Sequence, residues 1–486
     1  MTMQKDSKKS KAKAVPKSNT GEIIGVMVFF VAVFLAMIIY LSHFVATNEQ
    51  KMINNSYNSR QEILLSKNYR GSIFTADGAV VAETVFTSDG KEVRNYPYKN
   101  LFSHVVGYST KGRIGVEEFC NYYLINSNIP LTEKVANTTA GVKNPGNNVY
   151  TTLDLEMQQA ADDAMGIYKG AIVVTEVATG KILALVSKPD FDPNEIVEIW
   201  DELLVDKESS VLMNRVTTGL YPPGSTFKMI TSLEYIRENA DSYEDYSYNC
   251  TGSYKNDGNV IHCYHNIRHN KVDFVKSFAK SCNTSYTNIG MSLDRERFTK
   301  TLDALLFNQE LELDFTTAIS KTPVSASISD EDMMQVSIGQ GTVQITPMHL
   351  NMITAAIANN GVLMRPYVVD RVETAGGIKV QTYKSKEYDR LMTEEESAIL
   401  REMMVEVVER GTATEISGYG YTVGGKTGSA EYNSKNDSHA WFTGFAPAEN
   451  PEIAVTVIIE GAGSGGDYAA PMARRVLDAY FKQKTE

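Results

Sequence analysis

The sequence predicts a mixed α/β (α+β) fold, in which an antiparallel sheet is packed between helices behind a single transmembrane helix and a small strand-rich pedestal. Three observations predict it. Residues 23–41 contain neither a charge nor a proline. From residue 48 to about 147 the chain is polar, with short strand-like runs and turn signals. Beyond that point come two strand-like runs, helical patterns, three further strand-like runs and a last helix.

Composition bounds the class of protein. The chain has 486 residues, of which 43% are hydrophobic and 22% charged, a balance typical of a folded protein of two or three domains. Its net charge of −12 argues against nucleic acid as the main partner, because phosphate binding needs clustered Lys and Arg. Four cysteines are too few for a disulfide scaffold.

The N-terminal segment predicts a membrane anchor. A helix over residues 23–41, at ~1.5 Å per residue, spans roughly the ~30 Å hydrocarbon core. Residues 1–22 carry six lysines, so we expect a cytoplasmic basic tail, an anchor over 23–44 and an extracytoplasmic body. A buried soluble helix is disfavoured because the stretch is apolar on every face. A cleaved signal peptide is the stronger rival, but the run is long and no good cleavage site follows it.

The sequence pattern changes near residue 148, from polar segments with short strand-like runs to longer strand and helix patterns. It predicts a pedestal over residues 48–148 and a larger domain over 149–486. In the larger domain, residues 171–177 and 182–186 flank a turn and predict a β-hairpin. Thr393 and Glu396 form a capping-box pattern ahead of an amphipathic helix that ends before Gly411. The expected last elements are three strands over residues 421–430, 440–446 and 453–459, and a helix over about 471–481.

The first chemical motif is a serine followed by a lysine. Residues 222–230 read PPGSTFKMI, in which Ser225 and Lys228 lie at i and i+3 on one helical face. A serine hydroxyl is a weak nucleophile that needs a base. A lysine in a dry pocket has a lowered pKa and can act as that base. Alone, the pattern also fits a serine near a helix N-cap with an exposed lysine.

Two further motifs complete an ordered set. Ser281 and Asn283, two residues apart, can line one cleft, although an isolated triplet of this kind also fits an ordinary turn. Residues 424–430 read GGKTGSA, in which Lys426 and Thr427 offer a cation and a hydroxyl to a carboxylate. The alternative without a function is that these residues form a glycine-rich edge strand. The strong signal is the order Ser-x-x-Lys, Ser-x-Asn, Lys-Thr-Gly.

On these motifs the chain resembles the class B penicillin-binding proteins, which are membrane-anchored peptidoglycan D,D-transpeptidases. The resemblance implies the penicillin-binding and serine β-lactamase-like transpeptidase fold. Further stretches resemble family signatures, namely residues 70–73 with 77–78, 115–117, 151–154 with Gln158, 339–341 with 346–347, and 441–442 with 444–447.

The resemblance implies roles for the acid–base residues. Ser225 would attack the carbonyl of the penultimate D-Ala of a stem peptide ending in D-Ala-D-Ala, and Lys228 would take its proton. Ser281 would relay a proton to the leaving D-Ala amine. Asn283 would hold Lys228 and the substrate backbone.

The resemblance also implies the substrate-binding residues and the partners. Lys426, Thr427, Gly428 and Ser429 would bind substrate, with the terminal carboxylate on Lys426 and Thr427. Backbone N–H groups of Ser225 and Ser429 would form the oxyanion hole. β-Lactams would trap Ser225, and no metal or organic cofactor is expected. The pedestal is too short for a glycan-polymerising domain, so the implied partner is a separate polymerase of the shape, elongation, division and sporulation (SEDS) family.

The cysteines and histidines leave two alternatives open. Cys250 and Cys263 flank a polar loop and could pair outside the membrane. His262, Cys263, His265 and His269 crowd together, but their spacing fits no common zinc pattern, so no metal is predicted. Cys120 and Cys282 are expected to be packing residues.

Competing functions share the acylation chemistry. A β-lactamase or a D,D-carboxypeptidase would let water attack the acyl-enzyme, but a β-lactamase needs neither anchor nor pedestal. A β-lactam sensor or an idle scaffold in the wall-synthesis complex is the non-enzyme alternative. The intact Ser225 and Lys228 pair argues against the scaffold, and the short tail argues against a sensor.

Overall fold

The structure is a computed structural model that describes the whole chain except residues 1–19, 55–59, 207, 433–437 and 485–486. It divides into two compact units, Met1–Asn58 and Ser59–Glu486. Most of the predicted basic tail, residues 1–19 of 1–22, lies outside the described residues.

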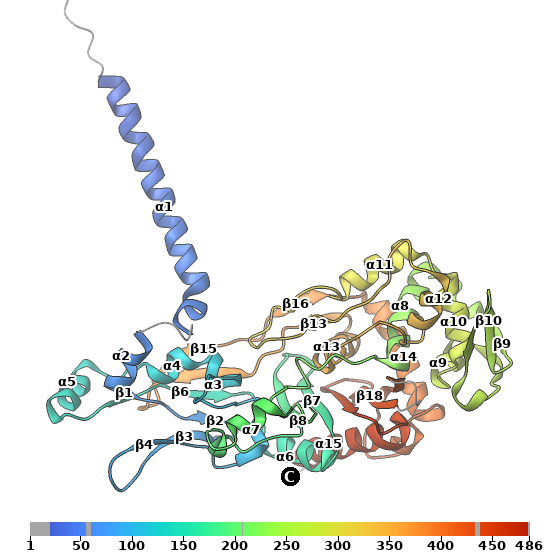
Figure 1. Cartoon of the computed structure of the whole chain (residues 1–486). Helices are drawn as coiled ribbons and strands as arrows, with labels where there is room; N and C mark the ends of the chain where they lie inside the picture. The colour runs from blue at the N-terminus through green and yellow to red at the C-terminus, as the bar shows by residue number, and fades with distance from the viewer. Residues whose placement is uncertain (1–19, 55–59, 207, 433–437, 485–486) are drawn as a thin grey trace, which may run out of the picture. The chain divides into compact units, whose positions relative to one another are not determined.

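The first unit is built around one long helix, α1 (Thr20–Asn54) (Figure 1). Its segment Thr20–Val45 has a mean hydropathy of 2.9 and buries none of its most apolar window. By length and composition this segment can cross a membrane, and it contains both the predicted span, residues 23–41, and the predicted anchor, residues 23–44.

The second unit contains a five-stranded sheet in which every pairing is antiparallel. The predicted hairpin is confirmed, and so are the three late strands. The first of the late strands begins at Gly424 rather than at residue 421, and the second begins at Ser438 rather than at 440. In spatial order the strands are β17 (Gly424–Glu431), β18 (Ser438–Ala446), β19 (Ile453–Ile459), β7 (Gly170–Glu176) and β8 (Ile182–Lys188).

Helices cover both faces of this sheet, as predicted (Figure 1). β19 is buried at every position, as expected of a strand covered on both sides. On one face lie α13 (Pro347–Ala358) and α14 (Glu394–Arg410), and on the other α6 (Leu155–Met165) and α15 (Ala470–Gln483). The capping box before α14 is confirmed, because both of its reciprocal hydrogen bonds are formed between Thr393 and Glu396.

A helical layer beside the sheet surrounds α8 (Lys228–Glu238). Residues 228–236 of α8 are all buried, which makes it the central helix of this layer. It packs against α10 (Asn283–Ser292), α11 (Arg295–Ala304) and α14, while α9 (Phe274–Ala279) packs against α14 and α10, and α12 (Asp330–Val336) against α10.

Between α8 and α9 lie two small two-stranded sheets. β9 (Ser247–Cys250) pairs with β12 (Asn270–Asp273), and β10 (Ser253–Asn256) pairs with β11 (Asn259–His262). Two-stranded sheets are marginal by themselves, so this segment needs further contacts to hold its shape.

A six-stranded sheet joins the pedestal to the larger domain. Its central strand, β6 (Asn148–Thr151), pairs in parallel with β2 and antiparallel with β14. The predicted boundary between residues 148 and 149 therefore falls inside a strand that both regions share. In spatial order the strands are β15 (Lys379–Thr382), β14 (Val369–Glu373), β6, β2 (Ile73–Phe74), β3 (Val80–Phe86) and β4 (Glu92–Asn95).

A buried ionic cluster holds the pedestal together. Glu117 is fully buried, with Arg70 Nε 2.5 Å from Oε2 and Arg94 Nε 2.7 Å from Oε1. Burial raises the pKa of Glu117, but the two guanidinium groups outweigh it and hold the pKa below its usual value.

The remaining elements are α2 (Arg60–Lys67), β1 (Asn68–Tyr69), α3 (Gly115–Phe119), α4 (Asn121–Ile125), α5 (Leu131–Ala140), β5 (Asn144–Pro145), α7 (Trp200–Val205), β13 (Val362–Met364) and β16 (Glu387–Arg390).

Candidate active site

Ser225 sits in a tight turn that leads into α8. A 3₁₀ helix over Gly224–Phe227 carries it, and α8 begins at Lys228, so the two side chains face each other as predicted. Gly224 has a φ of +54°, and a Cβ built on it would lie 2.8 Å from the carbonyl oxygen of Ser429. The turn therefore lies directly against β17, and only glycine fits there.

Two hydrogen bonds fix this turn from outside. Gly224 N–H donates to the carbonyl oxygen of Gly339 at 2.8 Å. The indole N–H of the buried Trp441, on β18, donates to the carbonyl oxygen of Pro222 at 3.0 Å. The acceptor Gly339 and the donor Trp441 both lie in stretches that resemble family signatures. Those signatures therefore have a structural role here, which is to hold the turn in place.

Lys228 is the hub of the site. Its Nζ lies 3.1 Å from Ser225 Oγ, 3.2 Å from Ser281 Oγ and 2.8 Å from Asn283 Oδ1. It also donates to the carbonyl oxygen of Ser281 at 2.8 Å. The side chain is fully buried, and this desolvation lowers the pKa of Lys228 to about 7. A large neutral fraction of the amine is therefore present near neutral pH.

Ser281 adopts a backbone conformation that usually takes glycine. Its φ is +53°. Its N–H donates to the carbonyl oxygen of Phe278, and Cys282 N–H donates to that of Ser277, which is the Schellman pattern closing α9. Ser281 thus occupies the left-handed position of this motif, where a side chain is strained. The strain aims its hydroxyl at the two lysines of the site.

Lys426 reaches the same hydroxyl from the opposite side. It lies on β17, and its Nζ is 3.1 Å from Ser281 Oγ. It is fully buried, and desolvation followed by repulsion from Lys228 lowers its pKa well below the usual value.

The next residues of β17 complete one wall of the site. Thr427 shares a 2.5 Å hydrogen bond with Thr412 through their hydroxyls. A Cβ on Gly428 would lie 3.0 Å from the carbonyl oxygen of Pro223, so this glycine allows the Ser225 turn to approach. Ser429 accepts a hydrogen bond from Gly465 N–H at 3.3 Å. All eight site residues predicted from the sequence thus lie on the elements that meet here.

A cleft of about 960 Å³ opens beside these residues. Asn283 lines it, together with aromatic residues that the sequence analysis missed. Tyr432 and His439 stack with ring centroids 4.1 Å apart, and burial lowers the pKa of His439 to about 4, so its imidazole is neutral. The sequence signal that could have found His439 is its spacing of two residues from Trp441, which places both side chains on one face of a strand.

The cysteines depart from the sequence-based alternatives. All four lie in the described part of the chain and are free, so the Cys250–Cys263 pairing is not formed. Cys120 is buried as expected. Cys263 and His269 come together with Cys250 and Cys282, whereas His262 and His265 are exposed and lie outside this group.

Comparison with known proteins follows this geometry. The family model of the penicillin-binding protein transpeptidase domain matches residues 170–478, and that of the penicillin-binding protein A dimerisation domain matches residues 70–149. The peptidoglycan D,D-transpeptidase PbpA of Mycobacterium tuberculosis is 32% identical, over 86% of this chain and 91% of the relative. The peptidoglycan D,D-transpeptidase MrdA of Acinetobacter baumannii is 30% identical, over 80% of this chain and 66% of the relative.

The fold also matches that of a solved penicillin-binding protein. The ceftriaxone acyl-enzyme complex of penicillin-binding protein A from M. tuberculosis superposes with a TM-score of 0.79 at 30% identity, covering 86% of this chain and 99% of that one. Sequence, fold and motif geometry therefore agree. The chain belongs to the class B penicillin-binding proteins, the family of peptidoglycan D,D-transpeptidases.

Proposed function

We propose that this protein cross-links peptidoglycan stem peptides through an acyl-enzyme on Ser225, and that β-lactams inhibit it by acylating the same hydroxyl. The observation that carries the proposal is the chain of contacts from Ser225 to Lys228, Ser281 and Lys426, each link between 3.1 and 3.2 Å. Such a chain supplies a nucleophile, a base and a proton relay within hydrogen-bond reach.

In acylation, neutral Lys228 takes the proton of Ser225 as its Oγ bonds to the carbonyl carbon of the penultimate D-Ala. The oxyanion that forms is stabilised by backbone N–H groups of Ser225 and Ser429. The closeness of Gly224 to the Ser429 carbonyl supports this pairing of turn and strand. The C–N bond then breaks, and the terminal D-Ala leaves with a proton relayed from Lys228 through Ser281.

In deacylation, the amine of a second stem peptide attacks the ester carbonyl. Its proton returns to Ser225, and the new amide bond is the cross-link. Before acylation, Lys426 and Thr427 hold the terminal carboxylate of the donor, and Asn283 holds Lys228 and the peptide backbone. The cleft beside Asn283 is the natural path for the extended peptide.

We further propose the predicted organisation: a cytoplasmic tail over residues 1–22, a membrane anchor over 23–44, a pedestal over 48–148 and a transpeptidase domain over 149–486. The lysines of the tail favour this orientation. We expect a SEDS-family glycan polymerase to supply the strands, contacting the anchor and pedestal. Co-purification of this polymerase with the full chain, and its loss when residues 23–44 are replaced by an unrelated span, would test that partnership.

The catalytic proposal is tested by following a fluorescent penicillin on the full chain in detergent. We expect stable label on the wild type and none on Ser225→Ala. Incubation with paired stem peptides should then release D-Ala and yield a cross-linked dimer. Rapid loss of label with hydrolysed drug would indicate a β-lactamase instead. D-Ala release without dimer would indicate a carboxypeptidase, and no label on either protein would favour the scaffold.

A further inference from the structure

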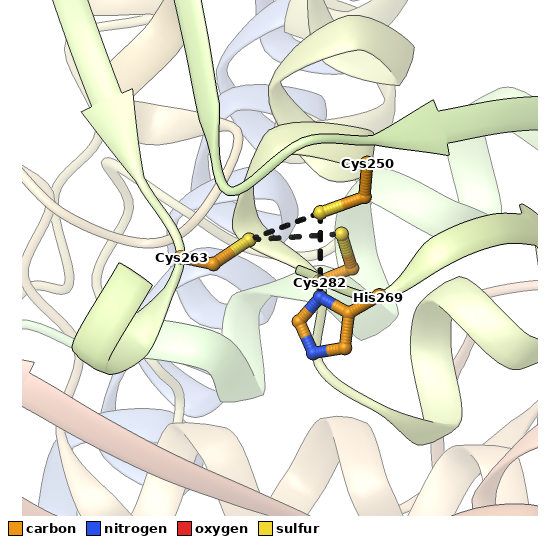
Figure 2. A group of neighbouring side chains, drawn as sticks. All are labelled: Cys250, Cys263, His269 and Cys282. Carbon is orange, nitrogen blue, oxygen red and sulfur yellow. Dashed lines mark hydrogen bonds between the residues drawn. The ribbon is translucent and has the colours of Figure 1, made fainter. Parts of the chain in front are cut away.

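Beside the active site, three cysteines and a histidine converge on one point (Figure 2). Their ligand atoms all lie within 4.8 Å of one another. Cys250, Cys263 and Cys282 are buried and form a small cluster separate from the main hydrophobic core, while His269 is half-buried at its edge.

Three of the six distances between the ligand atoms match the edges of a tetrahedral metal site, and the other three are at most 4.8 Å. Cys263 Sγ lies 3.6 Å from Cys250 Sγ and 3.8 Å from Cys282 Sγ, and Cys250 Sγ lies 3.5 Å from His269 Nδ1. Four ligands around Zn²⁺ at ~2.3 Å for sulfur and ~2.0 Å for nitrogen are separated by about 3.8 Å for sulfur pairs and about 3.5 Å for a sulfur–nitrogen pair.

A disulfide explains this cluster less well. The sulfur–sulfur distances are far longer than the ~2.05 Å of a disulfide bond. A Cys250–Cys263 bond would also leave Cys282 as a lone buried thiol, and it would give His269 no reason to face the sulfurs. Three thiolates and one imidazole are a ligand set that zinc prefers.

The hydroxyl of Thr284 supports the cluster from behind. It donates to Cys250 Sγ at 3.2 Å and lies 3.4 Å from Cys282 Sγ. Hydrogen bonds of this kind orient thiolate ligands and are the usual surroundings of a structural metal.

The four residues lie where the short strands of two small sheets meet α10, which both sheets contact. Cys250 ends β9, Cys263 follows β11, His269 precedes β12, and Cys282 precedes α10. The two small sheets are thereby tied to each other and to the helix. A bound metal is a common staple for such short segments.

The same cluster borders the catalytic motif. Cys282 lies between Ser281 and Asn283, and Asn283 Nδ2 donates to the carbonyl oxygen of His262, next to Cys263, at 3.0 Å. We propose that Cys250, Cys263, His269 and Cys282 bind one Zn²⁺, and that this ion fixes the strained Ser281–Asn283 segment against Lys228. The three thiol protons are released to solvent as the zinc–sulfur bonds form. This departs from the sequence-based prediction of no metal. The positioning effect rests on the proposed function, whereas the binding of zinc does not.

The first test measures metal content by plasma mass spectrometry on the full chain, purified in detergent without chelators. We expect about one zinc per chain in the wild type. Cys263→Ser and His269→Asn should lose it. Two matched controls should keep it: Cys120→Ser, a buried free cysteine outside the cluster, and His265→Asn, an exposed histidine of the same loop.

A second measurement guards against variants that fail to fold. Wild-type protein is stripped of metal and reloaded with Co²⁺, which should give thiolate-to-cobalt charge-transfer absorption and the strong visible bands of tetrahedral cobalt. Absence of zinc together with absence of this spectrum would overturn the proposal. So would a Cys250–Cys263 disulfide in a thiol-trapped digest, or zinc retained in both cluster variants.

The positioning effect is read from penicillin acylation. His269→Asn should acylate about tenfold more slowly than the wild type, whereas His265→Asn should match it. Equal rates would overturn the positioning role. A wild type that binds zinc but is never acylated would instead contradict the proposed function and leave the metal site supported.

Discussion

Lys228 and Lys426 approach the same hydroxyl, that of Ser281, at 3.2 and 3.1 Å. Both lysines are fully buried, and the charge of Lys228 lowers the pKa of Lys426. Two buried ammonium groups this close to each other are costly in free energy. We therefore expect only one of the two amines to be protonated in the free protein. On the proposed function, a substrate carboxylate at Lys426 would favour the proton there and leave Lys228 neutral as the base.

The first prediction concerns pH. Because the pKa of Lys228 is lowered to about 7, acylation should be slow below that pH and rise through it, falling about tenfold per pH unit on the acid side. Besides desolvation, the groups that act on the pKa of Lys228 are the Cys282 and Cys263 thiolates, whose negative charge raises it. The measurement is the second-order acylation rate by stopped flow. A rate that stays flat from about pH 5.5 to about 8.5 would contradict a lysine base.

The second prediction separates the Ser281 hydroxyl from its backbone. Ser281→Ala and Ser281→Gly both remove the hydroxyl, but glycine relieves the positive φ. If the hydroxyl relays the proton, both variants should acylate ~10²–10⁴-fold more slowly. Ser292→Ala, on the exposed end of α10, is the control and should acylate normally. Full activity in Ser281→Gly would mean that the hydroxyl is not needed.

The motifs of the candidate site were predictable from the sequence because each is local. Ser225 and Lys228 share one helical turn, and Lys426 and Thr427 share one strand, so short-range periodicity already brings them together. The strained φ of Ser281 was not predictable, since serine at a helix C′ position breaks the usual preference for glycine.

Long-range pairing explains what the sequence could not reveal. The domain boundary was drawn at residue 148 from a change in texture, yet β6 pairs with strands on both sides of that boundary. The Cys250 and Cys282 ligands were missed because their approach to His269 depends on the pairing of β9 with β12 and on the start of α10. Spacing along the chain carries no trace of either contact.

The third prediction concerns the turn that carries Ser225. Gly224→Ala would drive a Cβ against the carbonyl oxygen of Ser429 in a backbone conformation with positive φ, and so push Ser225 off β17. A displacement of about 1 Å should slow acylation by ~10²-fold. Gly78→Ala is a matched control, because Gly78 also has a positive φ but no atom near its Cβ position. Similar losses of acylation in both variants would point to backbone strain in general instead.

The last prediction concerns the pedestal. Glu117→Leu leaves Arg70 and Arg94 buried beside each other without their carboxylate, which should lower the opening free energy of the pedestal by about 3–5 kcal/mol. Hydrogen exchange of the β3 and β4 amides measures this opening. Glu118→Leu, on the exposed face of the same helix, should leave the exchange unchanged. Exchange in Glu117→Leu that matches the wild type would show that packing, rather than the buried ionic cluster, stabilises the pedestal.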